Sequence, residues 1–287
     1  MGVIGGSGLY EIDGLENIEE VVLSTPFGAP SDAFITGDLG ETRMVFLPRH
    51  GRGHRINPSE INYRANIWGM KRLGVTRILG VGAVGSLREE IPPGDFVAVD
   101  QFIDRTRHRS DTFFERGVVA HVMFGDPICG ALRATLRDAA TEAGVTVHDG
   151  GTYVCMEGPQ FSTRAESEMY RSFGAHVIGM TNLQEAKLAR EAEICYATLA
   201  MSTDYDCWRE GHDDVTVDAI LEVMGKNVVH AREAVRIAAP RAAALGACAC
   251  HTALGTAILT SPDAITDEAH LRLGLLLERP LAARSHS

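Results

Sequence analysis

Short β-rich runs alternate with amphipathic helical stretches along this chain, and this alternation limits its fold more than any other feature. The runs typical of buried strands are residues 2–4, 44–47, 77–81, 95–99, 152–154, 176–178 and 196–202. The helical stretches are residues 60–72, 126–143, 164–173, 183–192 and 217–239. The order predicts an α/β fold, a single domain with a central mixed, mostly parallel sheet flanked by helices.

Length and composition set the domain organisation that we expect. The chain has 287 residues, 45% of them hydrophobic, which is enough for one large domain with a sizeable core. We expect residues 1–245 to form this domain. Residues 246–287 are expected to form a C-terminal extension, and the sequence assigns it no role.

The charge balance limits the partners of the chain. It has 27 Lys and Arg against 38 Asp and Glu, a net charge of −11, so its surface repels nucleic acid and acidic membranes. Residues 242–260 lack these four residue types, but they are mostly Ala, Gly, Thr and Cys, which is too polar for a membrane span. The start of the chain lacks the pattern of a secretory signal. We therefore predict a cytoplasmic protein without a nucleic-acid or membrane partner.

The six cysteines do not form a recognised metal-binding or disulfide pattern. They are Cys129, Cys155, Cys195, Cys207, Cys248 and Cys250, and no two of them are spaced as C-x-x-C. A chain of this length does not need a disulfide framework. We expect reduced thiols and no metal site.

One glycine-rich segment matches the fingerprint of a dinucleotide site. Residues 80–85 read G-x-G-x-x-G after a predicted strand, and Asp100 follows about twenty residues after the first glycine. The fingerprint also needs a long helix, but only residues 86–91 precede the helix-stopping Pro92-Pro93-Gly94. A turn at the end of the strand, able to bind a smaller anion through backbone N–H groups, is the preferred interpretation.

Two further loops favour anion binding. Gly5-Gly6-Ser7-Gly8 follows the first predicted strand, and its glycines let the backbone approach an anion closely. Residues 48–55 place three arginines and two histidines in an otherwise acidic protein. His50 and His54 could be metal ligands, but the neighbouring arginines repel a cation, so an oxyanion fits better. A plain tight turn and a solvated basic loop are the structural alternatives.

A pair of carboxylates follows the last predicted strand. Strand periodicity predicts that Asp204 and Asp206 lie on one face, at the edge where open α/β sheets bind ligands. Mutual repulsion and burial raise the pKa of one acid, which can then donate a hydrogen bond to a heteroaromatic nitrogen. The same pair could instead hold a metal and a nucleotide sugar, as in glycosyltransferases, or cap the helix that starts near Val217.

Taken in order, the motifs of residues 3–239 resemble those of the methylthioadenosine phosphorylases, in the trimeric purine nucleoside phosphorylase superfamily. The resemblance rests on Gly5-Gly6-Ser7-Gly8, Pro26-Phe27-Gly28 with Pro30-Ser31-Asp32, Arg49-His50-Gly51, Asn62-Tyr63-Arg64-Ala65-Asn66, Gly85-Ser86-Leu87-Arg88, Glu157-Gly158-Pro159, Arg164-Ala165-Glu166, Gly179-Met180-Thr181 and Asp204-Tyr205-Asp206. It implies a pentosyltransferase of purine and methionine salvage that converts 5′-methylthioadenosine and phosphate to adenine and 5-methylthioribose 1-phosphate. It also implies a homotrimer or a dimer of trimers, with inorganic phosphate as co-substrate and no metal or organic cofactor.

The resemblance also implies a set of site residues. Phosphate would be bound by Ser7, Arg49, His50, Gly82, Ala83 and Thr181. The nucleoside would be bound by Ser162, Met180, Asp204, Asp206, Val217 and, from a neighbouring subunit, His121. Asp204 would act as the catalytic acid at N7 of the purine, Asp206 would accept from the 6-amino group, and Val217 would suit a methylthio group.

Several alternatives stay open at the level of sequence. A phosphorylase of the same fold could act on inosine, guanosine or methylthioinosine, although Asn would then be expected at the position of Asp204. A dinucleotide-binding module and a metal-dependent sugar transferase are rivals from other classes. Gly82 stands where many relatives carry a hydroxyl residue, which would remove one phosphate donor. Some relatives carry a C-x-C pair that oxidises, and a Cys248–Cys250 bridge here would close a small strained ring.

Overall fold

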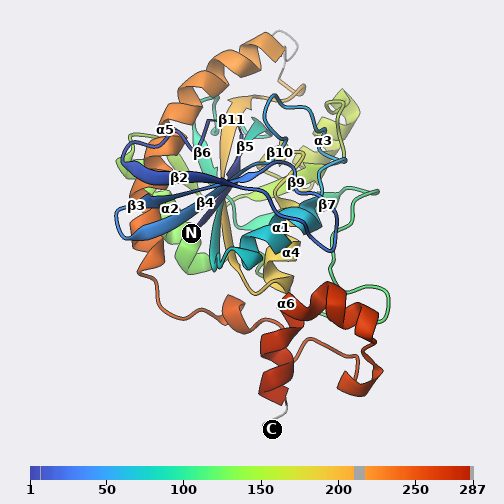
Figure 1. Cartoon of the computed structure of the whole chain (residues 1–287). Helices are drawn as coiled ribbons and strands as arrows, with labels where there is room; N and C mark the ends of the chain where they lie inside the picture. Colours follow the sequence, from blue (N-terminus) through green and yellow to red (C-terminus); the bar gives the residue numbers. More distant parts are fainter. Residues whose placement is uncertain (7, 210–216, 285–287) are drawn as a thin grey trace.

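The computed structural model describes residues 1–6, 8–209 and 217–284, and they form an α/β structure around one mixed sheet (Figure 1). The strands are β1 (Gly2–Gly5), β2 (Leu15–Val21), β3 (Phe34–Leu39), β4 (Thr42–Pro48), β5 (Arg77–Ser86), β6 (Phe96–Ala98), β7 (Gln101–Arg105), β8 (Val147–Asp149), β9 (Thr152–Met156), β10 (Val177–Gly179) and β11 (Cys195–Asp204). Six of the ten pairings among the described strands are parallel, which confirms the predicted fold class.

Strand β5 is the centre of the sheet. The strands follow the order β2-β3-β4-β1-β5-β10-β9-β7, while β11 pairs with the other edge of β5 and leads to β6 and β8. Strands β1 and β10 share one edge of β5: β1 pairs with it as far as Gly80, and β10 pairs with it from Gly85. Between these two residues none of the described strands lies beside that edge of β5, and this opening positions the site.

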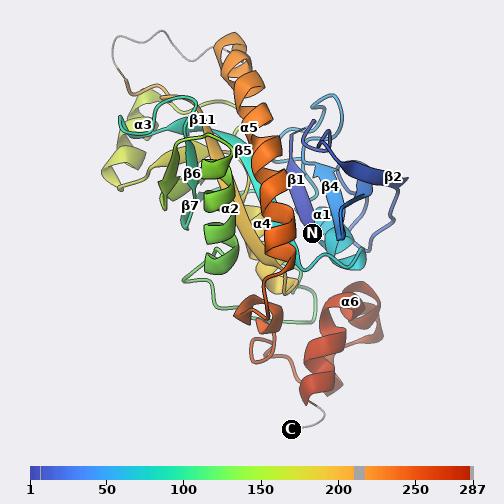
Figure 2. The same ribbon diagram turned by 90° about the vertical axis from the view of Figure 1, so that its left-hand side faces the viewer.

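Helices cover both faces of the sheet. They are α1 (Tyr63–Arg72), α2 (Gly130–Glu142), α3 (Arg164–Ser172), α4 (Leu183–Glu191), α5 (Val217–Ala243) and α6 (Asp267–Arg284). Helices α2 and α5 pack together on one face, with α1 and α4 on the other (Figure 2). Side chains cap two of the helices: Asn62 accepts from Ala65 N at α1, and Thr163 with Glu166 forms a capping box at α3.

The predicted strands and helices are present. The sequence pattern missed four strands, however, and it predicted some elements to be shorter than they are. β2 and β3 pair as an antiparallel ribbon at one end of the sheet, and all but the two end residues of β2 are exposed, so no buried run marks it. β7 and β8 also escaped prediction, being short and partly exposed. Strand β5 runs to Ser86, five residues beyond its predicted end. α5 continues past Pro240 to Ala243.

The C-terminal segment, residues 246–284, packs against the amino ends of β5 and β11 (Figure 1). Arg77, the first residue of β5, donates to the carbonyl oxygen of Gly246 over 2.7 Å. Leu273, Leu276 and Leu277 of α6 belong to the main hydrophobic core. The predicted domain boundary at 245 therefore lies just after the end of α5, where the chain begins to pass along the amino ends of β5 and β11. None of the described helices is both long and apolar enough to cross a membrane.

Candidate active site

Arg49 lies buried between the ends of β1 and β4 and the middle of β5. It follows β4, and its backbone N–H donates to the carbonyl oxygen of Gly5 over 2.8 Å, which ties it to the end of β1. Its guanidinium donates from Nη1 to the oxygen of Val81 (2.9 Å) and from Nη2 to that of Ile4 (3.2 Å). The other two arginines of this loop, Arg52 and Arg55, pair instead with the carboxylate of Asp32.

A buried carboxylate holds the Arg49 side chain in place. Glu185, in the first turn of α4, accepts from Nε and, over 3.0 Å, from Nη2 of Arg49. Burial acts to lower the pKa of Arg49, but Glu185 outweighs it and the pKa rises, so the guanidinium stays charged. A guanidinium has five N–H donors, and the hydrogen bonds within the described residues use four of them. One N–H of Nη1 is left for a ligand.

The open stretch of β5 brings Gly82 to this N–H. A Cβ atom on Gly82 would lie 3.1 Å from Asn182 Oδ1, 3.7 Å from Arg49 Nη1 and 3.9 Å from Thr181 Oγ1. Backbone groups of a strand alternate between its two edges, so Ala83 presents its N–H at the edge where Val81 presents its carbonyl. The prediction of a turn at Gly82 and Ala83 was wrong, because β5 continues as a strand. The two residues are nevertheless beside Arg49.

The same strand rules out the geometry of a dinucleotide site. Gly80, Gly82 and Gly85 all lie within β5, and no helix occurs among the described residues between Ser86 and Phe96. A dinucleotide fingerprint requires a helix whose N-terminus faces the pyrophosphate. The match to G-x-G-x-x-G is therefore a consequence of close packing: a Cβ on Gly80 would collide with the ring of Tyr196 in β11.

Thr181 and Asn182 close the other side of the opening. Both are buried, and Asn182 has a φ of +67°. Its amide donates to Tyr196 OH (2.7 Å) and to Thr198 Oγ1 (2.8 Å), while Tyr196 OH donates to Glu185 Oε2 (2.7 Å). Sequence reasoning found Thr181 but missed Asn182, Glu185 and Tyr196. The missing signal was that a buried arginine requires a buried carboxylate.

His50 lies next to Arg49 as a neutral side chain. Its Nδ1 is 2.9 Å from the carbonyl oxygen of Ile56, and its ring stacks on His54 with 4.2 Å between centroids. Burial, and then the charge of Arg49, lowers the pKa of His50 to about 4. A carbonyl only accepts, so Nδ1 carries the proton and Nε2 carries a lone pair that no hydrogen bond among the described residues uses.

Asp204 and Asp206 meet at Gly85, near the end of β5. A Cβ on Gly85 would lie 3.0 Å from Asp204 Oδ1 and 3.3 Å from Cβ of Asp206. The prediction that strand alternation brings the two acids together was wrong, because a turn after β11 does so. β11 has a bulge before Asp204 and ends there, and Asp206 has a φ of +51° and donates its N–H to Asp204 Oδ1 over 2.8 Å.

Burial makes both acids easier to protonate than usual. It raises the pKa of Asp204, although the Thr203 hydroxyl, 2.7 Å from Oδ2, opposes part of the rise. It also raises the pKa of Asp206, where the charge of Asp204 adds to the rise. Oδ2 of Asp206 is buried and has no hydrogen-bond partner among the described residues. An unpartnered buried oxygen of this kind is ready to receive a donor from a ligand.

A metal fits this acid pair poorly. Both oxygens of Asp204 already accept hydrogen bonds, from Thr203 and from Asp206 N. Among the described residues no third His, Cys, Asp or Glu gathers with the pair as a metal-ligating group. The geometry therefore disfavours the sugar-transferase alternative.

Ser162 lies beside the acid pair, and Met180 lies beside Thr181. The carbonyl of Ser162 accepts from the thiol of Cys207, the residue after Asp206, over 3.3 Å. Met180 precedes Thr181, and its side chain fills the space above Gly158. The Met180 carbonyl accepts from Arg109 Nη1 over 2.5 Å. The buried side chain of Arg109 also forms an ion pair with Glu157, and sequence reasoning missed this arginine.

Three predicted site residues are not placed at this opening. Ser7 lies outside the described residues. Val217 is the first residue of α5, and the structure does not describe its side chain. His121 is exposed and donates its backbone N–H to the oxygen of Ala257 in the C-terminal segment over 2.9 Å. Within one chain it therefore lies at the amino end of the sheet, away from Asp204.

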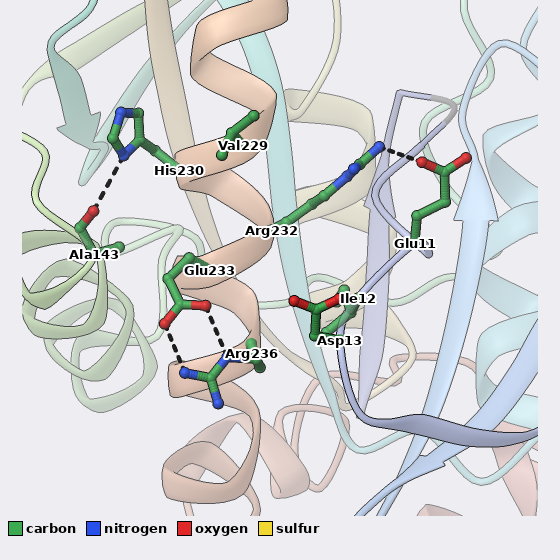
Figure 3. A pocket seen from close by; sticks show the side chains of 9 residues that line it. All are labelled: Glu11, Ile12, Asp13, Ala143, Val229, His230, Arg232, Glu233 and Arg236. Carbon is green, nitrogen blue, oxygen red and sulfur yellow. Dashed lines mark hydrogen bonds and ion pairs between the residues drawn. The ribbon is translucent and has the colours of Figure 1, made fainter.

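A separate hollow of about 360 Å³ lies between α5 and the loop after β1 (Figure 3). Four of its charged side chains form two ion pairs: Arg232 with Glu11 over 2.6 Å, and Arg236 with Glu233. Arg232 also donates to the carbonyl of Gly8 over 2.6 Å, so it fixes the loop that contains the predicted phosphate-binding turn. Arg232 therefore supports that loop, and the charges of these two ion pairs are not available to a ligand.

Comparison with known proteins assigns the chain and its fold to a family. The family model described as "Phosphorylase superfamily" matches residues 1–239. S-methyl-5′-thioadenosine phosphorylase of Geobacter sulfurreducens is 62% identical over 278 residues, which are 96% of this chain and 97% of the relative. The corresponding protein of Synechocystis is 56% identical, over 96% of this chain and 86% of the relative.

Solved structures give the same picture. A methylthioadenosine phosphorylase from an antarctic soil metagenomic library superposes with a TM-score of 0.92 at 47% identity, over 96% of this chain and 97% of the other. Methylthioadenosine phosphorylase from Schistosoma mansoni in complex with adenine superposes with a TM-score of 0.81 at 36% identity, over 96% and 97%.

Proposed function

The chain belongs to the phosphorylase superfamily, and from this we propose that it catalyses phosphorolysis of 5′-methylthioadenosine to adenine and 5-methylthioribose 1-phosphate. Inorganic phosphate is the co-substrate, and the proposed reaction needs no metal or organic cofactor. The curated relatives at 51–62% identity that carry the name of this activity span nearly the whole chain.

The observation that carries this function is that one strand joins two chemically different half-sites. Gly82, beside Arg49 and Thr181, and Gly85, beside Asp204 and Asp206, are three residues apart on β5. Three residues of a strand span about 10 Å. This separation suits a pentose that has phosphate on one side and a purine on the other.

At the first half-site, we propose that phosphate is bound by the free N–H of Arg49, the Ala83 N–H and the Thr181 hydroxyl, with Ser7 completing it. A neutral His50 would accept a hydrogen bond from a P–OH group at Nε2, because its Nδ1–H donates to the carbonyl oxygen of Ile56. Phosphate held under the sugar supplies both the nucleophile and the counter-charge for an oxocarbenium-like transition state.

At the second half-site, a protonated Asp204 would donate to N7 and stabilise the negative charge that develops on the departing purine. Asp206 would accept from the 6-amino group through its unpartnered Oδ2, and Ser162 would contact the base. A 6-oxopurine presents a carbonyl at that position, so two acceptors would face each other. This arrangement favours adenine.

We also propose that Met180 contacts the ribose and that Val217 contacts the methylthio group, with His121 supplied by a neighbouring subunit. The position of His121 beside Ala257, in the C-terminal segment, supports a neighbouring subunit as the source of this contact. A cytoplasmic homotrimer, or a dimer of trimers, is therefore the proposed working form. Light scattering would measure its mass, and a monomer with full activity would contradict it.

The test is an assay of the purified protein with methylthioadenosine, adenosine, inosine and methylthioinosine, each with and without phosphate. We expect adenine release from methylthioadenosine that depends on phosphate. Equal release without phosphate would identify a nucleosidase. Faster reaction of the two 6-oxopurine nucleosides would favour a phosphorylase of the same fold with the other base preference.

A further inference from the structure

Four of the six cysteines gather in one cluster, far from the proposed active site. The sulfur atoms of Cys129, Cys195, Cys248 and Cys250 all lie within 4.8 Å of one another, and those of Cys129 and Cys248 are 3.6 Å apart. Cys129, Cys195 and Cys250 are buried, and Cys248 is partly buried. Cys155 and Cys207 are not part of the group.

Local structure explains how distant residues reach one point. Cys195 opens β11, and Cys129 is the residue before the first turn of α2. Cys248 and Cys250 come from the C-terminal segment, where a short 3-10 helix (Ala249–Thr252) turns both side chains toward the body. Because 119 residues separate Cys129 from Cys248, no local spacing marks the cluster in the sequence.

The spacing of the sulfur atoms fits a tetrahedral metal site. Zinc bound by four thiolates has Zn–S distances of about 2.3 Å, which places neighbouring sulfurs about 3.8 Å apart. A disulfide needs its two sulfurs at about 2.05 Å. We propose that Cys129, Cys195, Cys248 and Cys250 bind a structural Zn²⁺ ion.

The surroundings of the cluster support zinc over other ions. The group contains four soft sulfur ligands and no carboxylate, which suits zinc and not Mg²⁺ or Ca²⁺. His251 Nε2 lies 3.4 Å from Cys195 Sγ and can donate a hydrogen bond to it. Cys129 stands at the N-terminus of α2, where the helix dipole favours a thiolate. Binding releases the thiol protons to solvent and leaves a complex with a net charge of −2.

A metal here gives the C-terminal segment a function. Two ligands come from the main domain and two from residues 246–284, so the ion would fasten this segment across the amino ends of the strands. None of its four cysteines is among the residues proposed to bind substrate, so the test of the site uses metal content and not activity.

The first measurement is the metal content of full-length protein purified from zinc-supplemented medium without chelators. We expect about one zinc per chain, and release of that zinc when the thiols are titrated with a mercurial reagent. Refolding with Co²⁺ should give thiolate-to-cobalt charge-transfer absorption. Iron in place of zinc, or no stoichiometric metal together with no cobalt spectrum, would overturn the proposal.

Variants locate the ion. Cys248→Ser/Cys250→Ser should lower bound zinc at least tenfold, whereas Cys207→Ser, outside the cluster, should retain it. Zinc retained by the double variant would overturn the assignment. If the double variant fails to fold, alkylation of wild-type protein decides: zinc should protect these four thiols selectively. An unreduced wild-type chain two hydrogens lighter than expected, with the missing hydrogens mapped to these cysteines, would show a disulfide and not a zinc site.

Discussion

Two acids near opposite ends of β11 differ in how their carboxylate oxygens are hydrogen-bonded. Asp206, after the carboxyl end, leaves Oδ2 without a hydrogen-bond partner among the described residues. Glu193, just before the amino end, accepts from Leu254 N over 2.9 Å and from both Nε and Nη2 of Arg279. The chain's own C-terminal segment fills one end of the sheet, and a hydrogen-bonding position is left open at the other.

This difference indicates where binding energy is available. A buried polar atom without a partner costs about 1 to 3 kcal/mol, which a ligand donor can recover. The same donor would gain nothing at Glu193, because its oxygens are already engaged. The carboxyl end is thus organised for a ligand, and the amino end is organised for stability.

Asp204→Asn should have the largest effect, because it removes the proposed acid and keeps the shape. Positioned acids contribute about 10²- to 10⁴-fold to rate, so we expect kcat for methylthioadenosine to fall within this range. Activity on inosine should fall much less. Since burial raises the pKa of Asp204, wild-type activity should decline as pH rises through that pKa, and the variant should lose this limb.

Steady-state kinetics of both nucleosides from pH 5 to 9 would measure this effect. Asp126→Asn, at an exposed position, serves as the control. Equal losses on adenine and 6-oxopurine substrates would remove the base-specific role from Asp204 and weaken the contrast between the two ends of the sheet.

The next largest effect is expected on stability, at Glu185. Only 3% of the Arg49 side chain is exposed, so Glu185→Gln leaves a buried positive charge without its carboxylate partner. This should lower the free energy of unfolding by about 3 to 5 kcal/mol. Glu193→Gln is the matched variant at the other end. Arg279 is 45% exposed, so water can solvate it and the loss should be clearly smaller.

Urea denaturation of the two variants at pH 7.5 tests this pair. The phosphate KM provides a second measurement, because Glu185→Gln releases the guanidinium that we propose binds phosphate, whereas Glu193→Gln should leave it unchanged. Equal stability losses would show that exposure of the cation does not distinguish the two ends.

Glu191, at the last turn of α4, should make stability depend on pH. It accepts from the Thr112 hydroxyl and from Phe113 N, and burial raises its pKa to about 7 from 4.5. Asp111 adds to the rise, and Lys187 opposes it. The folded state thus binds the proton more tightly, so the stabilisation is complete below pH 4.5 and is lost as pH rises through about 7.

A shift of this size corresponds to about 3 kcal/mol. Glu191→Gln should therefore show a flatter stability curve than wild type in urea denaturation at pH 5, 6, 7 and 8. The exposed Glu142→Gln is the control. If the variant kept the wild-type slope, another group would be responsible for the pH dependence.

The sequence predicted those site residues that stand at the ends of buried strands. Arg49 and Asp204 follow apolar runs, and a strand end at the edge of a sheet is a local property that residue patterns report. The turn at Gly82 was wrong because closely packed glycines occur inside a strand as well as in turns. Glu185 and the cysteine cluster were missed, since polar or small residues on predicted helices and loops carry no sign of a partner more than a hundred positions away.

Gly82→Ala should have the smallest effect. It tests directly whether phosphate binds at the open edge of β5. The added methyl would lie 3.1 Å from Asn182 Oδ1, which Tyr196 and Thr198 hold in place, so it would crowd the space proposed for phosphate. Losing about one hydrogen bond corresponds to about 1 kcal/mol, or a rise of about fivefold in the phosphate KM. Gly125→Ala, where a Cβ would meet nothing within 4 Å, is the control for adding a methyl group. A lower melting temperature with an unchanged phosphate KM would mean that the gap in the edge of β5 is a packing feature and that phosphate binds elsewhere.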